Sequence, residues 1–257
     1  MNNLLGLGYQ IKDEQRSFWR NPPAAVFTFG FTLMFLVLFS AIFGNQKLGA
    51  FHGIKFIDYF VPSIITFGII SSCYTSIAML LVNRTKNGAF KRLRLTPLPQ
   101  SIYLGGLLGS SVITGLLLTI ITILFGMIFY HLNFPSNIGI FILSIAVGSV
   151  AFSLLGVLVA TFVPNIESGP PVINGIILPL YFISGTFFVI SPNSIISKIA
   201  GVFPVRPFIL STFYAYQSTK YVPSNFDKAG FLTLLIWIIA TSVLVFYRFK
   251  HLGHRKP

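Results

Sequence analysis

Six long apolar segments make up most of the chain, and the stretches outside them hold all of its charged residues. Each segment is close to the roughly 20 residues that a helix needs to cross about 30 Å of hydrocarbon. A chain inside a bilayer must satisfy its own backbone hydrogen bonds, so uncharged segments of this length predict membrane-spanning helices. We place the six spans at residues 24–44, 59–83, 102–130, 138–163, 171–190 and 229–247.

The composition supports a membrane protein. Of the 257 residues, 54% are hydrophobic and only 9% are charged, whereas ordinary globular domains have about 25% charged residues. The net charge of +13 would indicate nucleic-acid binding in a soluble protein. Here most cations flank apolar segments, so we expect them to face the lipid bilayer or a partner protein, with no nucleic-acid partner. The single Cys73 excludes a disulfide within the chain and a cysteine metal site. We expect residues 1–257 to form one all-α transmembrane domain that stays in the cell membrane.

The cations also predict the orientation. If both termini lie inside the cell, the inner segments hold about twice as many Lys and Arg residues as outer segments of nearly equal total length. Because Lys and Arg next to a span are retained on the cytoplasmic side, this bias favours an N-in and C-in topology.

The segment before the first span differs in character from the spans themselves. Residues 1–23 predict an amphipathic helix that lies on the membrane surface, although Glu14 and Gln15 interrupt its apolar face. Pro22-Pro23 disfavours a continuous helix and would turn the chain into the membrane. The apolar face consists of Leu4, Leu7, Ile11 and Phe18.

Residues 191–228 are too polar for a span and too apolar for a solvated loop. Apolar residues at helical spacing are interrupted by Pro204 and Pro207, and several Tyr and Phe residues follow. Such rings are enriched at membrane interfaces. We therefore expect one or two short re-entrant or interfacial helices in the outer leaflet, before the last span.

Two features inside the spans bear on helix packing. Gly105 and Gly109 form a G-x-x-x-G pattern that would let another helix approach closely. Pro179 lies inside the fifth span, six residues before Gly185, where it should free a carbonyl and kink the helix.

The groups that the sequence lacks disfavour several classes of function. None of the spans has an ionisable side chain that would suit an ion-coupled carrier, which disfavours that class without excluding it. The chain has no P-loop motif, so energy for uphill transport would have to come from another polypeptide. The enzyme alternative is an intramembrane serine protease with Ser184 as nucleophile and His131 as base. A scaffold that transports nothing is a further alternative.

Residues 84–101 form a basic loop between the second and third spans. A glycine and a Thr-Pro pair delimit a short stretch in which apolar residues alternate with cations, the composition of a small helix at the membrane surface. A partner protein could act on this cytoplasmic loop.

The residues of this loop carry a family resemblance. The stretch GAFKRLRLTPLP, followed by a span that opens with Leu104-Gly105-Gly106, resembles the G-T-x-E-R-L-x-x-T-P loop in the permeases of type-2 ATP-binding-cassette (ABC) exporters. The stretch ILPLYFISGTFFVISPNSIISKIAGVFPVRPF resembles the proline-bearing fifth span and proline-rich outer segment of the same family. Nearly the whole chain follows that pattern.

The resemblance implies a half-transporter permease of the bacterial cytoplasmic membrane. It would pair with a second copy and with two separate ATP-binding subunits, which carry the ATP and Mg, and it would export drugs, lipids or glycan-linked lipids. This chain would hold no cofactor or metal and would not itself be an enzyme. The family usually has acidic residues where this sequence has Lys86-Asn87 and Lys91, which puts the usual charge pairing in doubt and implies a more acidic ATPase partner. The coupling helix that contacts the ATPase would comprise Gly88, Phe90, Lys91, Arg92, Leu93, Arg94, Thr96 and Pro97.

The resemblance and the uncharged spans agree on the kind of pathway. A route lined by aromatic and aliphatic side chains suits a hydrophobic or amphipathic substrate that enters from the inner leaflet. The candidate lining residues lie on the second and fifth spans and are Phe67, Tyr74, Asn174, Tyr181, Phe182 and Ser184.

Overall fold

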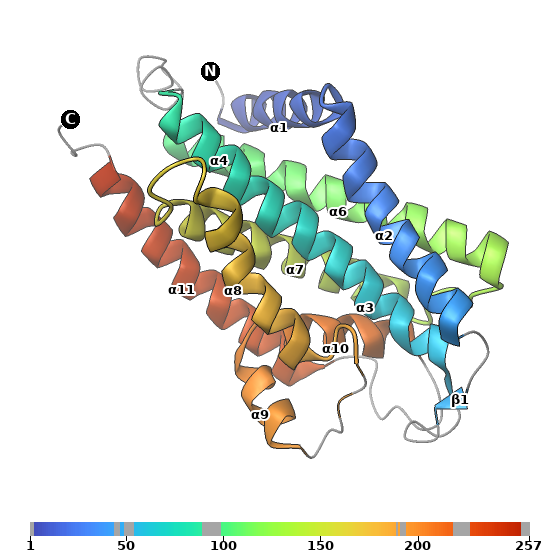
Figure 1. Cartoon of the computed structure of the whole chain (residues 1–257). Helices are drawn as coiled ribbons and strands as arrows, with labels where there is room; N and C mark the ends of the chain where they lie inside the picture. Colours follow the sequence, from blue (N-terminus) through green and yellow to red (C-terminus); the bar gives the residue numbers. More distant parts are fainter. Residues whose placement is uncertain are drawn as a thin grey trace.

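The computed structural model describes residues 3–43, 47–48, 54–88, 99–188, 190, 194–217 and 227–252. Nearly all of these residues are helical, and the strands β1 (Lys47–Leu48) and β2 (Ile54–Lys55) form a two-residue antiparallel pair. The all-α prediction is therefore confirmed (Figure 1). The helices are α1 (Asn3–Trp19), α2 (Pro22–Phe43), α3 (Phe56–Ile70), the π-helical segment η2 (Ser71–Thr75), α4 (Ser76–Lys86), α6 (Gln100–Tyr130), α7 (Ile138–Ala160), α8 (Gly169–Ser184), α9 (Ile195–Val202), α10 (Val205–Tyr216) and α11 (Lys228–Leu252).

In the described part of the chain, five helices are long and apolar enough to cross a membrane. A sixth would be added if the bent pair α9–α10 counted as one span. The five are Pro22–Phe43, Tyr59–Lys86, Gln100–Tyr130, Ile138–Ala160 and Lys228–Arg248.

Helix α8 occupies the place of the predicted fifth span, 171–190, but has only 16 residues. It ends at Ser184 because Gly185 takes a left-handed conformation, with φ of 86°, a common way to terminate a helix. Its backbone is helical through Pro179.

The two ends of the helical bundle hold different elements (Figure 1). One end holds α1, the last turn of α4, the first turn of α6, the α7–α8 connection and the last turn of α11. The opposite end holds α9, α10 and the β1 strand. Both chain termini thus lie at one end of the molecule.

The predicted outer segment contains two helices, α9 and α10, which meet at an angle of 98°. The apolar side chains Ile195, Ile196 and Val202 of α9 are exposed. In contrast, α10 is almost wholly buried and packs against α3, α7 and α11. The ring of Phe208 lies where a side chain at Gly148 of α7 would have to go, which brings α10 close to that span. One of the two predicted helices is therefore part of the protein core, which fits the re-entrant form of the prediction, and α9 alone has an exposed apolar face.

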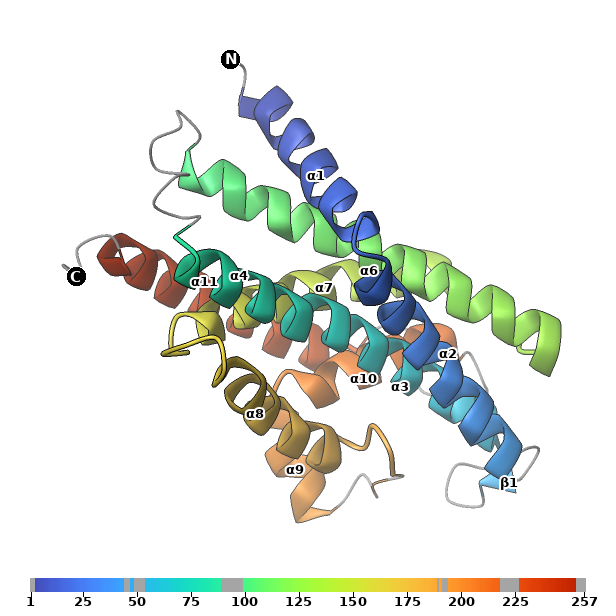
Figure 2. The ribbon, with the colours of Figure 1, turned by 45° about the horizontal axis from the view of Figure 1, so that its top comes forward.

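Helix α1 lies against α6 (Figure 2). A Cβ atom at Gly105 would lie 2.9 Å from Leu7 Cδ1, and one at Gly109 would lie 2.7 Å from Ile11 Cδ1. The two glycines thus permit the close helix approach that their spacing predicts, and α1 is the helix that approaches.

Candidate coupling network and transport pathway

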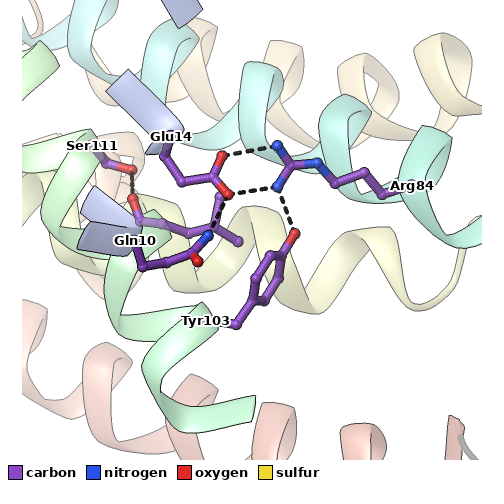
Figure 3. A network of polar contacts seen from close by, with 6 residues as sticks. Gln10, Glu14, Arg84, Tyr103 and Ser111 are labelled. Carbon is purple, nitrogen blue, oxygen red and sulfur yellow. Dashed lines mark hydrogen bonds and ion pairs between the residues drawn. The ribbon is translucent and has the colours of Figure 1, made fainter. Parts of the chain in front are cut away.

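Three helices are joined by a polar network at the end of the bundle that holds both termini (Figure 3). Arg84 of α4 donates from Nη1 to Glu14 Oε1 at 2.7 Å and from Nη2 to Glu14 Oε2 at 2.9 Å. The same Nη1 donates to the hydroxyl of Tyr103 on α6 at 2.6 Å. Gln10 donates to Glu14 Oε1 at 2.9 Å. Because a two-point guanidinium–carboxylate pair is among the strongest side-chain contacts, this network fixes α1 to the other two helices.

The local sequence explains why these side chains meet. Arg84 lies in the last turn of α4, where a cation is favoured by the partial negative charge of the helix C-terminus. Tyr103 lies one turn into α6. Of the two helix ends that flank residues 89–98, the end of α4 is therefore bonded directly to Glu14, whose side chain is only 7% exposed. The start of α6 is linked to it through Arg84.

Gln15 adds a second polar contact between α1 and α6. Its amide donates to the carbonyl of Ser110 at 2.7 Å and to the hydroxyl of Thr114 at 2.9 Å. Glu14 and Gln15, which interrupt the apolar face of this helix in the sequence, therefore also have partners that the sequence did not predict. Each lies at a contact with another helix, so α1 is docked through both polar and apolar groups.

Most of the predicted coupling helix lies outside the described residues. Gly88 is described, and it has φ of 71° directly after the end of α4. This left-handed conformation favours glycine and ends the helix. The remaining predicted coupling residues, Phe90, Lys91, Arg92, Leu93, Arg94, Thr96 and Pro97, fall in the part that is not described.

The predicted pathway residues gather where α8 meets α3 and η2, but they do not share one surface. Phe67 and Tyr181 are buried with ring centroids 4.9 Å apart. The Tyr74 hydroxyl donates to the carbonyl of Ile173 on α8 at 3.0 Å. By contrast, Asn174 and Phe182 lie on the exposed face of α8. Some of the predicted pathway residues therefore lie in the interior of the chain, and the others lie on an open face of α8.

Ser184 lies at the C-terminal end of α8 and is buried. Its hydroxyl contacts the carbonyl of Tyr181 at 3.0 Å and the hydroxyl of Thr186 at 2.8 Å. Within the described residues His131 is not among its hydrogen-bond partners, so the arrangement that a serine protease needs is not formed there.

Arg206 is a functional candidate that the sequence interpretation missed. It lies within residues 191–228, which we predicted to lie in the outer leaflet, yet it is only 7% exposed in α10. Nη1 donates to the carbonyl of Ser184 at 3.1 Å, and Nη2 donates to the hydroxyl of Ser197 on α9 at 2.8 Å. The guanidinium therefore joins the end of α8 to α9 and α10. Its proline-rich context, VFPVRPF, carries no signal of these partners.

Helix α3 passes into α4 through one π-helical turn at η2, a feature that no sequence pattern predicted.

In the described residues no group of three His, Cys, Asp or Glu side chains could hold a metal ion.

A family model described as "ABC-2 type transporter" matches residues 8–216. The chain belongs to the ABC-2 type transporter family. The match includes Glu14, Arg84 and Arg206 as well as the whole of α8, and it confirms the resemblance seen in the sequence. Membership identifies a membrane component of a transporter and speaks against the protease.

Similarity to individual proteins is more distant. The chain is 25% identical over 157 residues to proteins named "Inner membrane transport permease YadH" from Escherichia coli strain K12, Escherichia coli O157:H7 and Shigella flexneri. The aligned region covers 60% of this chain and 60% of each relative.

Proposed function

We propose that this chain is the permease subunit of an ABC exporter in the bacterial cytoplasmic membrane. The family match carries the proposal, and the names of the relatives, inner membrane transport permeases, support it. Two ATP-binding subunits would supply the energy, with ATP and Mg bound on them, and a second permease copy would complete the pathway.

The polar network of Glu14, Arg84 and Tyr103 suggests how force from an ATPase would reach the spans. The proposed coupling segment, residues 88–97, lies between α4 and α6. Arg84 at the end of α4 contacts both Glu14 and Tyr103, so a push on this segment would move α1, α4 and α6 together. Contacts that make packed helices move as one unit are the physical basis of a rocking transition between two arrangements of the bundle.

The open face of α8 is where we place the second permease copy. Ile176, Leu178 and Phe182 are exposed there, and Asn174 lies among them. A face of this kind, uncharged and lined with aliphatic and aromatic groups, suits a hydrophobic or amphipathic cargo such as a drug, a lipid or a lipid-linked glycan. Closure of the ATPase subunits would open the pathway between the two α8 helices to the outside.

Purification from membranes in mild detergent tests the proposal. Wild-type protein should co-purify with a chain that carries a P-loop, and this chain should be lost from the variant Arg92→Glu plus Arg94→Glu. The matched variant Lys12→Glu plus Arg16→Glu reverses two exposed cations of α1 and should keep the partner. Recovery of the permease alone, under conditions in which a known exporter keeps its ATPase, would instead support an ion-coupled carrier or a scaffold.

A further inference from the structure

A cavity of about 400 Å³ lies between α1, α2, α6 and the segment formed by η2 and α4. It is at the end of the bundle that holds α1, and its size falls in the range of small-molecule sites. The exposed residues Ser17, Asn21 and Ser76 surround its mouth, while buried residues such as Glu14 and Ser111 form its floor. The cavity is distinct from the face of α8 that we assign to the transport pathway.

The lining of the cavity is divided between apolar and polar groups. Its large apolar members are Phe18, Ile77, Met79, Leu80 and Leu107. Most of the other lining residues carry hydroxyl, amide or carboxylate groups. A ligand that matches both kinds of group is amphipathic, with a polar headgroup and an apolar chain.

The hydrogen bonds of the lining specify the headgroup further. The hydroxyls of Ser72, Ser76 and Ser111 each donate to a carbonyl of their own helical segment, at 2.7 to 3.3 Å. A hydroxyl has one proton, so what these groups can still offer is acceptor lone pairs. The carboxylate of Glu14 is also an acceptor, and its charge is balanced by Arg84. A headgroup that donates hydrogen bonds would match these acceptors.

The π-helical turn η2 builds one wall of this cavity. Its extra residue changes which side chains face the same way, and Ser72, Thr75 and Ser76 all line the space. The backbone N–H of Ser76 bonds to the carbonyl of Ser71, five residues earlier. Single π-helical turns within α-helices are often found at functional sites.

We propose that this cavity binds the headgroup of a membrane amphiphile that carries N–H or O–H donors, such as the ammonium of an ethanolamine lipid or the hydroxyls of a glycolipid. The amphiphile enters from the cytoplasmic leaflet, beside helix α1, with its chain against the apolar residues of the lining. The site depends only on the location of the protein in a membrane and holds even if the proposed export function fails.

Native mass spectrometry of the delipidated, purified full chain tests the proposal. The probes are phosphatidylethanolamine, a diacylglycerol glycolipid and phosphatidylcholine, all with the same acyl chains. Phosphatidylcholine has the same net charge as phosphatidylethanolamine but no N–H donor. Because each lost hydrogen bond typically weakens binding severalfold, we expect at least one donor lipid to bind about tenfold more tightly than phosphatidylcholine. Whichever donor lipid shows the preference identifies the headgroup, amine or sugar.

Matched variants test whether the lipid binds in this cavity. Thr75→Trp fills the cavity and should remove the preference. Thr233→Trp adds the same ring at a half-buried hydroxyl residue of α11, outside the cavity lining, and should leave it unchanged. If Thr75→Trp does not fold, the variant Ser72→Ala plus Thr75→Val plus Ser76→Ala removes the oxygens at nearly constant volume and should weaken the preference. Equal binding of all three lipids to the wild-type protein, or a preference that survives in Thr75→Trp, would overturn the proposal.

Discussion

The carboxylate of Glu14 and the guanidinium of Arg84 form a two-point ion pair between residues 70 positions apart, with oxygen–nitrogen distances of 2.7 and 2.9 Å. One partner lies on the N-terminal helix α1 and the other on the last turn of α4. Their contact attaches the surface helix directly to the span that leads into the proposed coupling segment (Figure 3).

Glu14→Gln should destabilise the protein. The amide cannot keep both charged hydrogen bonds to Arg84, and the loss of a bond to a charged group costs about 2 kcal/mol. The unfolding temperature in detergent should fall by several degrees. Asp13→Asn removes the neighbouring carboxylate, which is exposed, and should have almost no effect. Equal effects of the two changes would show that the ion pair contributes little.

Gly156→Ala should disturb the contact between α7 and the π-helical turn. A Cβ atom at position 156 would lie 2.6 Å from the carbonyl oxygen of Tyr74, and a backbone atom cannot move aside as a flexible side chain can. Overpacking of this kind costs about 1 to 3 kcal/mol. Gly30→Ala on α2 has open space around the new methyl group, so it should be neutral or slightly stabilising. Thermal unfolding of the two variants measures the difference, and a stable Gly156→Ala variant would contradict this packing.

Tyr74→Phe and Tyr181→Phe remove hydroxyls from neighbouring buried rings and should behave differently. The first loses the hydrogen bond to the Ile173 carbonyl and should cost about 1 kcal/mol. The Tyr181 hydroxyl is buried without a hydrogen-bond partner among the described residues, so its removal should leave stability unchanged or raise it. If Tyr181 contacts cargo, Tyr181→Phe should change the cargo-stimulated ATPase rate of the complex while its unfolding temperature stays the same. A large loss of stability in Tyr181→Phe would show that the hydroxyl has a structural partner.

Arg206→Lys should loosen the end of the bundle that holds α9 and α10. Lysine has a single ammonium and cannot reproduce the planar fork with which Arg206 reaches both Ser184 and Ser197. We expect faster proteolysis near α9 and a lower unfolding temperature. Lys198→Gln changes an exposed cation on α9 and serves as the control. Identical proteolysis patterns for the wild type and Arg206→Lys would exclude this role.

The spans could be predicted from the sequence because a helix that crosses the hydrocarbon of a bilayer must be long and uncharged. Both properties can be read from consecutive residues. The G-x-x-x-G at Gly105 and Gly109 also indicated a close helix contact correctly, since small residues act locally. The length of α8 was overestimated. The hydrophobicity of residues 171–190 continues past Gly185, whose left-handed backbone ends the helix at Ser184.

The polar contacts could not be predicted in the same way. Glu14 looked like a defect in an apolar face, because its partner Arg84 is distant in sequence and was assigned to a loop. The burial of Arg206 could not be predicted either, because its partners are a carbonyl and a hydroxyl that become available only where α8 ends and α9 begins. Burial of such groups depends on tertiary packing, which residue type and spacing do not encode.

The central claim is that a P-loop ATPase docks on the segment between α4 and α6, and site-specific photo-crosslinking in cells tests it most directly. A photoreactive residue in place of Leu93 should form an adduct with a chain that carries a P-loop. The same residue in place of Ile128, an exposed position near the opposite end of α6, should not capture that chain. Capture of the P-loop chain at Leu93 alone is the predicted result. Its absence at Leu93, or equal capture at both positions, would contradict the account.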